Sequence, residues 1–207
     1  MYSFDEAINI SLTRHYMRVE MRKMSLLKEM LDYNKLFVEE EKYRDYETTK
    51  YPNKRMVILT CMDTRLVELL PKALNVKNGD VKIVKTAGAL VSHPFGSIMR
   101  SILVALYQLK ADEVLVVGHH DCGMSGMSAT SMMENMKERG ISNETFDTLS
   151  YSGIDVEKWL SGFNKVEDSV AHSVNMIKNH PLMPEVPVHG LVIDPSTGKL
   201  DVVVEGY

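Results

Sequence analysis

Three short strand-like runs, separated by segments of helical character, constrain this sequence more than any other feature. The runs cover residues 56–60, 81–85 and 113–117, and the segments between them predict helices over 65–74 and 94–110. Short apolar-rich runs of this length are typical of strands buried on both faces. Strands that alternate with helices favour a parallel sheet with right-handed crossovers. The sequence therefore predicts an α/β fold with a mainly parallel central sheet and flanking helices.

The rest of the core predicts further helices and a closing hairpin. Residues 131–139 and 166–180 have helical character, and residues 143–162 are expected to form a loop with short helical turns. Residues 188–194 and 200–204 flank a Pro-Ser-Thr-Gly stretch, which is a hairpin signal. We therefore expect an antiparallel edge strand at the C-terminal end of the sheet.

The N-terminal segment has a different pattern. Residues 4–48 contain no proline or glycine. Apolar residues recur there at helical spacing, namely Ile8, Leu12, Tyr16, Leu26, Leu27, Met30 and Leu31. We expect about two helices forming an N-terminal arm over 1–50, an α/β core over 51–207, and a single domain over 1–207. An amphipathic arm needs a surface to cover its apolar stripe, which favours a homo-oligomer.

Charge and hydropathy limit the classes of partner. The net charge of -4 and the pI of about 6.0 give no reason to expect nucleic-acid or membrane partners. Arg14, Arg18 and Arg22 recur at helical spacing, but a solvated helix face explains them better than a phosphate-binding patch. No run approaches the ~18 apolar residues of a membrane span. With Asp5 and Glu6 near the start and no apolar stretch, no signal peptide is predicted, so we expect a cytoplasmic protein.

The only two cysteines, Cys61 and Cys122, each follow a predicted strand, and His119 lies three residues before Cys122. In an open α/β sheet, ligands bind beyond the carboxyl ends of the strands. These three side chains can therefore converge on one zinc ion and leave a fourth position open. Spacing alone leaves two alternatives: buried cysteines that only fill space, and a disulfide, which a cytoplasmic location disfavours.

Asp63 and Arg65 follow Cys61 at the same edge of the predicted sheet. A carboxylate beside a guanidinium can form a bidentate pair of fixed orientation. A salt bridge at a helix start, without any function, is the alternative interpretation because acids are favoured at helix N-termini.

Together these residues resemble the β-class carbonic anhydrase family, in particular its compact archaeal- and mycobacterial-like branch. The resemblance runs from about residue 50 to the C-terminal hairpin, and the N-terminal helices resemble the arm that these proteins pack onto a partner subunit. It is carried by one combined motif, Cys61-x-Asp63-x-Arg65 followed by His119-x-x-Cys122-Gly123.

The resemblance implies a zinc enzyme that interconverts CO₂ and bicarbonate by means of a zinc-bound hydroxide, as a homodimer or homotetramer. It implies that Cys61, His119 and Cys122 bind Zn²⁺ and that Asp63 and Arg65 form the catalytic dyad. In this family the aspartate is alternatively a fourth zinc ligand that closes the site. Because two thiolates cancel the formal charge of Zn²⁺, we expect activity to rise toward alkaline pH.

Other interpretations stay open at this point. His120 and His93 are candidates for a proton shuttle because histidine titrates near neutral pH, although a structural or surface role explains each better. A carbon disulfide or carbonyl sulfide hydrolase would use nearly the same site. Two further alternatives are a zinc-binding protein without catalysis and a metal-free domain with a redox-sensing cysteine pair.

Overall fold

The computed structural model describes residues 26–207, and the chain divides into two compact units between Glu47 and Thr48. In the first unit, residues 26–39 are helical and a short 3-10 helix, η1 (Lys42–Tyr46), follows. The helical character predicted around Leu26–Leu31 is confirmed. The helix predicted around Ile8, Leu12 and Tyr16, and the Arg14, Arg18 and Arg22 face, lie outside the described residues. The single domain over 1–207 stays a prediction.

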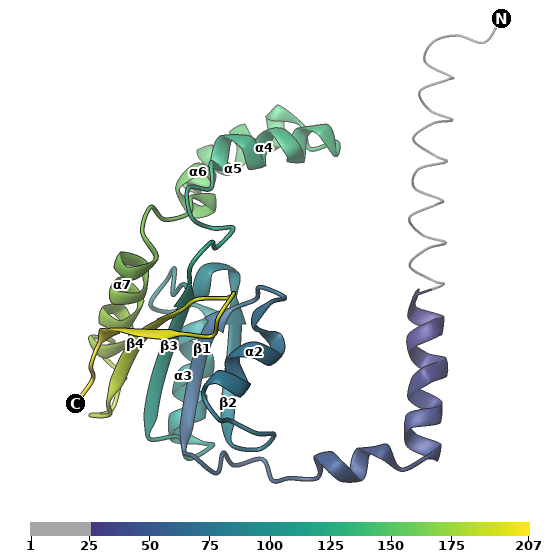
Figure 1. Cartoon of the computed structure of the whole chain (residues 1–207). Helices are drawn as coiled ribbons and strands as arrows, with labels where there is room; N and C mark the ends of the chain where they lie inside the picture. The colour runs from purple at the N-terminus through teal and green to yellow at the C-terminus, as the bar shows by residue number, and fades with distance from the viewer. Residues whose placement is uncertain (1–25) are drawn as a thin grey trace, which may run out of the picture. The chain divides into compact units, whose positions relative to one another are not determined.

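The second unit is built on a five-stranded sheet in the order β2-β1-β3-β4-β5 (Figure 1). β1, β2, β3 and β4 pair in parallel, and β5 pairs with β4 in the antiparallel direction. The mainly parallel sheet and the antiparallel edge strand are therefore confirmed. The strands are β1 (Met56–Cys61), β2 (Val81–Thr86), β3 (Glu113–His119), β4 (Val188–Ile193) and β5 (Leu200–Val204).

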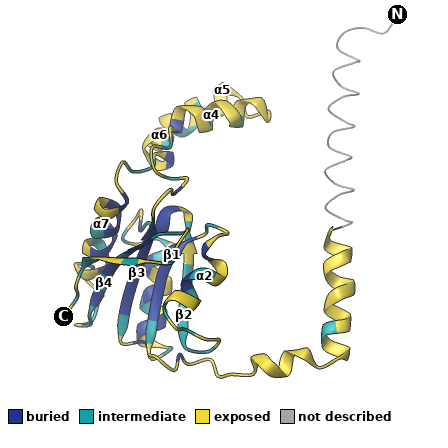
Figure 2. Ribbon diagram, viewed as in Figure 1, coloured by how far each residue is buried: buried dark blue, intermediate teal, exposed yellow. Residues whose placement is uncertain are grey.

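Helices cover both faces of the sheet, which explains why β1 and β3 are buried along almost their whole length (Figure 2). Val57 and Leu59 of β1 pack into the cluster formed with α3 (Ser97–Tyr107) and α7 (Val166–Lys178). Ile58, between them, faces the opposite cluster, to which α2 (Leu66–Ala73) contributes Leu66 and Leu70. Burying side chains of this kind contributes about 1.5–3 kcal/mol each. The flanking helices are therefore confirmed.

α7 packs closely against β3 and β4 near the end of β3. A Cβ added at Gly118 would lie 2.7 Å from Cγ2 of both Val166 and Val170, and one added at Gly190 of β4 would lie 2.7 Å from Val170 Cγ1. Any larger residue would push the helix away from the strands. His119 follows directly after Gly118, so this packing sets its position.

Two helix predictions need correction. Residues 143–162, expected to form a loop with short turns, contain the nine-residue α5 (Asn143–Tyr151) and the short α6 (Val156–Leu160). Side-chain caps start both helices, because Ser142 Oγ accepts from Thr145 N at 3.3 Å and Asp155 Oδ1 accepts from Lys158 N at 2.9 Å. The predicted 94–110 helix begins later, at Ser97, because Gly96 is still extended.

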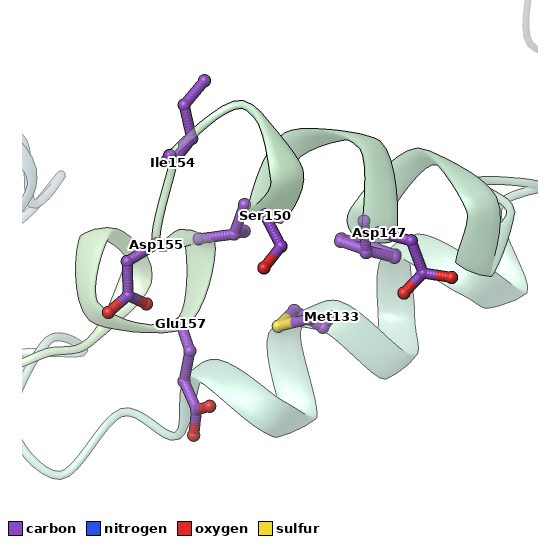
Figure 3. A pocket seen from close by; sticks show the side chains of 9 residues that line it. Met133, Asp147, Ser150, Ile154, Asp155 and Glu157 are labelled. Atoms are coloured by element: carbon purple, nitrogen blue, oxygen red, sulfur yellow. The ribbon is translucent and has the colours of Figure 1, made fainter.

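Together with α4 (Ala129–Glu138), α5 and α6 form a helical excursion between β3 and α7 (Figure 1). A pocket of about 470 Å³ lies among these helices, lined by residues that include Met133, Ser150 and Asp155 (Figure 3). None of the cysteines or histidines singled out by the sequence lines this pocket. Among residues 26–207, no helix combines the length and the apolar character needed to cross a bilayer.

Candidate metal centre

The sheet brings the three predicted ligands together at one edge. Cys61 is the last residue of β1 and His119 the last of β3, and these two strands are parallel neighbours. Cys122 follows after a turn in which Asp121 has a left-handed φ of 53°. The ligand atoms of Cys61, His119 and Cys122 all lie within 4.8 Å of one another, and all three residues are buried. Within the described part of the chain, these three residues form the group of side chains that could hold a metal ion.

The two thiols fit a zinc tetrahedron. Cys61 Sγ and Cys122 Sγ are free and lie 3.9 Å apart. Two sulfurs bound to one Zn²⁺ at about 2.3 Å in tetrahedral geometry would lie about 3.8 Å apart. The sulfurs are therefore spaced as two thiolate ligands of one ion would be.

His119 is arranged to donate a nitrogen lone pair to the same point. Its Nδ1 lies 2.8 Å from the His120 carbonyl oxygen, and because a carbonyl only accepts, Nδ1 carries the hydrogen. Nε2 then has a free lone pair, and it is buried without a hydrogen-bond partner. A buried polar atom without a partner is costly, and a metal ion would satisfy it.

Gly88 supports Cys61 from the loop after β2. Its N–H donates to Cys61 Sγ at 3.4 Å, and its φ of 73° lies in the left-handed region. A Cβ at this position would lie 2.9 Å from Phe163 Cε1 and 3.1 Å from Met124 Cβ. Glycine therefore fits this tight turn, and its hydrogen bond to the sulfur was not predicted from the sequence.

The electrostatic environment separates the two thiols. Burial raises the pKa of Cys61, but the neighbouring His119 and the backbone N–H groups of Asp63 and Gly88 outweigh it and lower the pKa to about 7. Burial, together with the nearby Cys61, raises the pKa of Cys122. Burial lowers the pKa of His119. The interactions with Cys61 and with the His120 carbonyl raise this pKa by a larger amount, so the net shift is upward. Because zinc binds thiolates, Cys61 is the ligand closer to its binding form at neutral pH.

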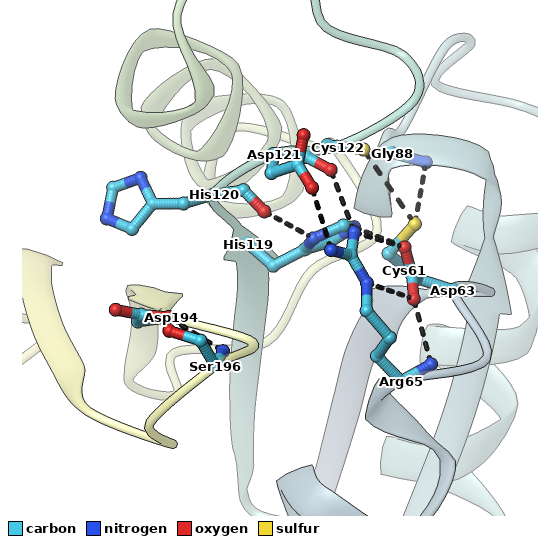
Figure 4. Close-up of polar contacts among 10 residues, drawn as sticks. All are labelled: Cys61, Asp63, Arg65, Gly88, His119, His120, Asp121, Cys122, Asp194 and Ser196. Atoms are coloured by element: carbon cyan, nitrogen blue, oxygen red, sulfur yellow. Dashed lines mark hydrogen bonds and ion pairs between the residues drawn. The ribbon is translucent and has the colours of Figure 1, made fainter.

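Asp63 and Arg65 form the bidentate pair that the sequence suggests (Figure 4). Arg65 Nε donates to Asp63 Oδ1 at 3.0 Å, Nη2 donates to Oδ2 at 2.8 Å, and the Arg65 backbone N–H donates to Oδ1 at 2.8 Å. These bonds hold the pKa of Asp63 down to about 2 and raise that of Arg65. Asp63 Oδ2 also lies 3.8 Å from His119 Nε2. An ionised carboxylate therefore lies beside the candidate ligands.

Both shuttle candidates lie at the surface. His120 is exposed, and its ring points away from Cys61 and Asp63 (Figure 4). His93 is exposed, and its Nδ1 accepts a hydrogen bond from Phe95 N at 3.0 Å. A shuttle role for either histidine stays a prediction. The sequence did not predict the contact between Arg65 and Asp121, whose carboxylate accepts from Nη1 at 2.8 Å.

The family follows from comparison with known proteins. The family model described as "Carbonic anhydrase" matches residues 56–200, which is more than half of the chain and includes every residue of the site. The chain belongs to the β-carbonic anhydrase family. Zinc is the metal of β-carbonic anhydrases, and Cys61, His119 and Cys122 form a group that could hold it.

Individual relatives agree with this assignment. This carbonic anhydrase is 64% identical over 185 residues to "Putative carbonic anhydrase YtiB" of Bacillus subtilis (strain 168), an alignment that covers 89% of this chain and 99% of the relative. The crystal structure of β-carbonic anhydrase isoform I from Trichomonas vaginalis superposes with a TM-score of 0.80 at 33% identity, over 87% of this chain and 98% of that one. A carbon disulfide hydrolase of Saccharolobus solfataricus is 30% identical over 79% of this chain and 87% of its own length.

Proposed function

We propose that this carbonic anhydrase catalyses the reversible hydration of CO₂ to bicarbonate and a proton, with Zn²⁺ held by Cys61, His119 and Cys122. The observation that supports this most is the position of Asp63. Its carboxylate lies 3.8 Å from the free Nε2 of His119 and is held by Arg65. A bound zinc ion supplies the Lewis acidity that makes water nucleophilic near neutral pH.

In this proposal the protein orients the attacking water through Asp63. Because its pKa is about 2, Asp63 is an acceptor of hydrogen bonds throughout the neutral range. With a metal held by Cys61, His119 and Cys122, Asp63 would accept a hydrogen bond from the attacking water and so orient it toward CO₂. Arg65 keeps both carboxylate oxygens in place, so that Asp63 orients water without taking the fourth position itself.

The surrounding backbone holds the ligands in their binding form. The His120 carbonyl fixes the His119 tautomer that leaves Nε2 free, and the Gly88 N–H favours the Cys61 thiolate. Such outer contacts typically change metal affinity by about 10–100-fold when removed. The ligand set therefore depends on loops after β2 and β3 as well as on the strand ends.

The test is stopped-flow CO₂ hydration on protein of measured zinc content, between pH 6 and 9. We expect turnover that scales with the zinc content and rises toward alkaline pH. Fully zinc-loaded protein without hydration activity over this range would refute the proposed function, and a flat profile would contradict the expected weak Lewis acidity.

Carbon disulfide hydrolysis is the second candidate, because a carbon disulfide hydrolase is 30% identical to this chain. Both reactions attack a linear apolar carbon centre, so the site alone does not separate them. The same zinc-loaded preparation should be assayed with CO₂ and with carbon disulfide. A kcat/KM for carbon disulfide above that for CO₂ would reverse the order of the two proposals.

We also propose that the protein works in the cytoplasm as a homodimer or homotetramer in which a second copy covers the arm. The helix over 26–39 exposes a run of large apolar side chains: Leu26, Leu27, Met30, Leu31, Leu36 and Val38 are each 51–58% exposed. Light scattering after gel filtration should give a multiple of 23.5 kDa. A Leu27→Ser, Leu31→Ser variant should shift toward the monomer, whereas Lys28→Ser, on the same helix, should not.

A further inference from the structure

Arg65 holds two aspartates at once, and the second, Asp121, lies outside the proposed dyad. Nη1 donates to Asp121 Oδ2 at 2.8 Å, and Nη2 donates to the Asp121 carbonyl oxygen at 2.8 Å. Nε and Nη2 donate to the two carboxylate oxygens of Asp63. A guanidinium has five N–H groups, so the two aspartates together use four of them without competing for any hydrogen.

The backbone at Asp121 is shaped for this contact. Its φ of 53° is left-handed, a conformation that aspartate and asparagine adopt more readily than most residues. In this turn both the carbonyl oxygen and the carboxylate reach Arg65 (Figure 4). Because Asp121 lies between His119 and Cys122, the contact joins the loop after β3 to the loop after β1.

The three side chains become more exposed from Asp63 through Arg65 to Asp121. The side chain of Asp63 is 17% exposed, that of Arg65 42% and that of Asp121 84%. A long, partly exposed arginine loses side-chain entropy when a single ion pair holds it. Asp121 offers two more acceptors on the solvent side, so Arg65 is fixed from both sides.

We propose that Asp121 is a positioning residue, which holds Arg65 where it keeps Asp63 turned away from the fourth metal position. This inference rests on the proposed zinc site. When Asp121 is lost, Arg65 moves more freely and Asp63, already 3.8 Å from His119 Nε2, reaches the metal more often. Asp121 thereby favours the open site over the closed one.

The test uses cobalt(II)-substituted full-length protein, whose visible spectrum reports the ligands of the metal, titrated with thiocyanate as a probe of the fourth position. Asp121→Gly removes the carboxylate but tolerates the left-handed turn, whereas Asp121→Asn keeps an acceptor in the same place. We expect thiocyanate to bind about two- to fivefold more weakly to Asp121→Gly, with a spectrum shifted toward one more oxygen ligand. Asp121→Asn should match the wild type.

Two further variants complete the experiment. Asp121→Lys places a like charge beside Arg65 and should weaken thiocyanate binding at least as much as Asp121→Gly. Asp112→Asn is the matched control, because Asp112 is also an exposed aspartate paired with an arginine, Arg55, but at the other edge of the sheet. It should leave the spectrum and the thiocyanate affinity unchanged.

Wild-type thiocyanate affinity and spectrum in both Asp121→Gly and Asp121→Lys would overturn the inference. Because binding is read from cobalt and not from turnover, this result is independent of whether the enzyme hydrates CO₂. Conversely, a shifted affinity in a protein that does not hydrate CO₂ would support Asp121 and refute the proposed function.

Discussion

The two edges of the sheet, at the carboxyl and at the amino ends of its parallel strands, each hold a histidine beside a carboxylate, at the same separation. At the carboxyl ends of the parallel strands, His119 Nε2 lies 3.8 Å from Asp63 Oδ2. At the opposite edge, His189 Nε2 lies 3.8 Å from Glu113 Oε2. Both Nε2 atoms are buried without a hydrogen-bond partner. By this distance and by the burial of Nε2 the two pairs are alike.

The other ring nitrogen, Nδ1, has opposite hydrogen-bond roles in the two histidines. Nδ1 of His119 donates to a carbonyl oxygen, whereas Nδ1 of His189 accepts the Gly206 N–H at 3.0 Å. In the neutral ring, one nitrogen carries the hydrogen and the other the lone pair. His119 therefore presents a lone pair at Nε2, as a metal ligand must, while His189 presents an N–H toward Glu113. The backbone partner of the far nitrogen, and not the nearby carboxylate, separates the candidate metal ligand from a structural histidine.

Replacing each histidine by asparagine tests this difference most strongly. Asparagine keeps a polar group near the position of Nδ1 but has nothing at Nε2. We expect His119→Asn to lose more than about 100-fold in zinc affinity, beyond the range of outer contacts, and its activity with it. His189→Asn should keep full zinc content and activity within about twofold, at a cost in stability of about 1–3 kcal/mol. Metal analysis after dialysis, with stopped-flow assays and urea unfolding, measures all three. Equal zinc loss in both variants would refute the assignment.

The carboxylates give the next largest contrast. Asp63→Asn should keep zinc but lower kcat/KM by about 100-fold, a usual effect for a group that handles a proton or its hydrogen bond. Because the pKa of Asp63 is about 2, it stays ionised from pH 6 to 9, so the loss should be the same at every pH in this range. Glu113→Gln should match the wild type. A loss confined to the alkaline side would mean that Asp63 is already protonated on the acidic side and that Arg65 does not hold it ionised.

The same comparison shows how far sequence reasoning reaches. The order of strands and helices predicted the sheet, because buried strands and crossover helices have distinct patterns. The placement of Cys61, His119 and Cys122 at strand ends followed from that order, since parallel strands end at one edge. The tautomer of His119, the Gly88 bond to sulfur and the Asp121 contact were not predictable. They depend on backbone atoms whose positions are set by loop conformation, which residue identity leaves undetermined.

The two thiols should differ in reactivity once zinc is removed. With a pKa of about 7, Cys61 is about half ionised at pH 7, whereas the raised pKa of Cys122 leaves it protonated. The thiolate fraction falls as pH falls, so labelling of Cys61 by iodoacetamide should decline below pH 7 while that of Cys122 still increases above pH 9. In chelator-treated protein at pH 7, peptide mass spectrometry should show Cys61 labelled several times faster. Equal rates would mean that access, not ionisation, controls the labelling of Cys61 and Cys122, which are 5% and 6% exposed.

The smallest expected effect compares the two glycines that donate at opposite edges, Gly88 to Cys61 Sγ and Gly206 to His189 Nδ1. Gly88→Ala forces a Cβ against Phe163 and Met124 in a left-handed backbone, so it should cost about 1–3 kcal/mol and weaken zinc binding. A Cβ at Gly206 would also collide, 2.6 Å from the Val188 carbonyl oxygen, but at the opposite edge of the sheet. Gly206→Ala should therefore also cost about 1–3 kcal/mol but leave zinc affinity unchanged. Chelator competition and urea unfolding on both variants measure this. Because each glycine donates a hydrogen bond to a side chain at its own edge, weaker zinc binding in Gly206→Ala would mean that the two edges are coupled through the sheet and are not independent sites.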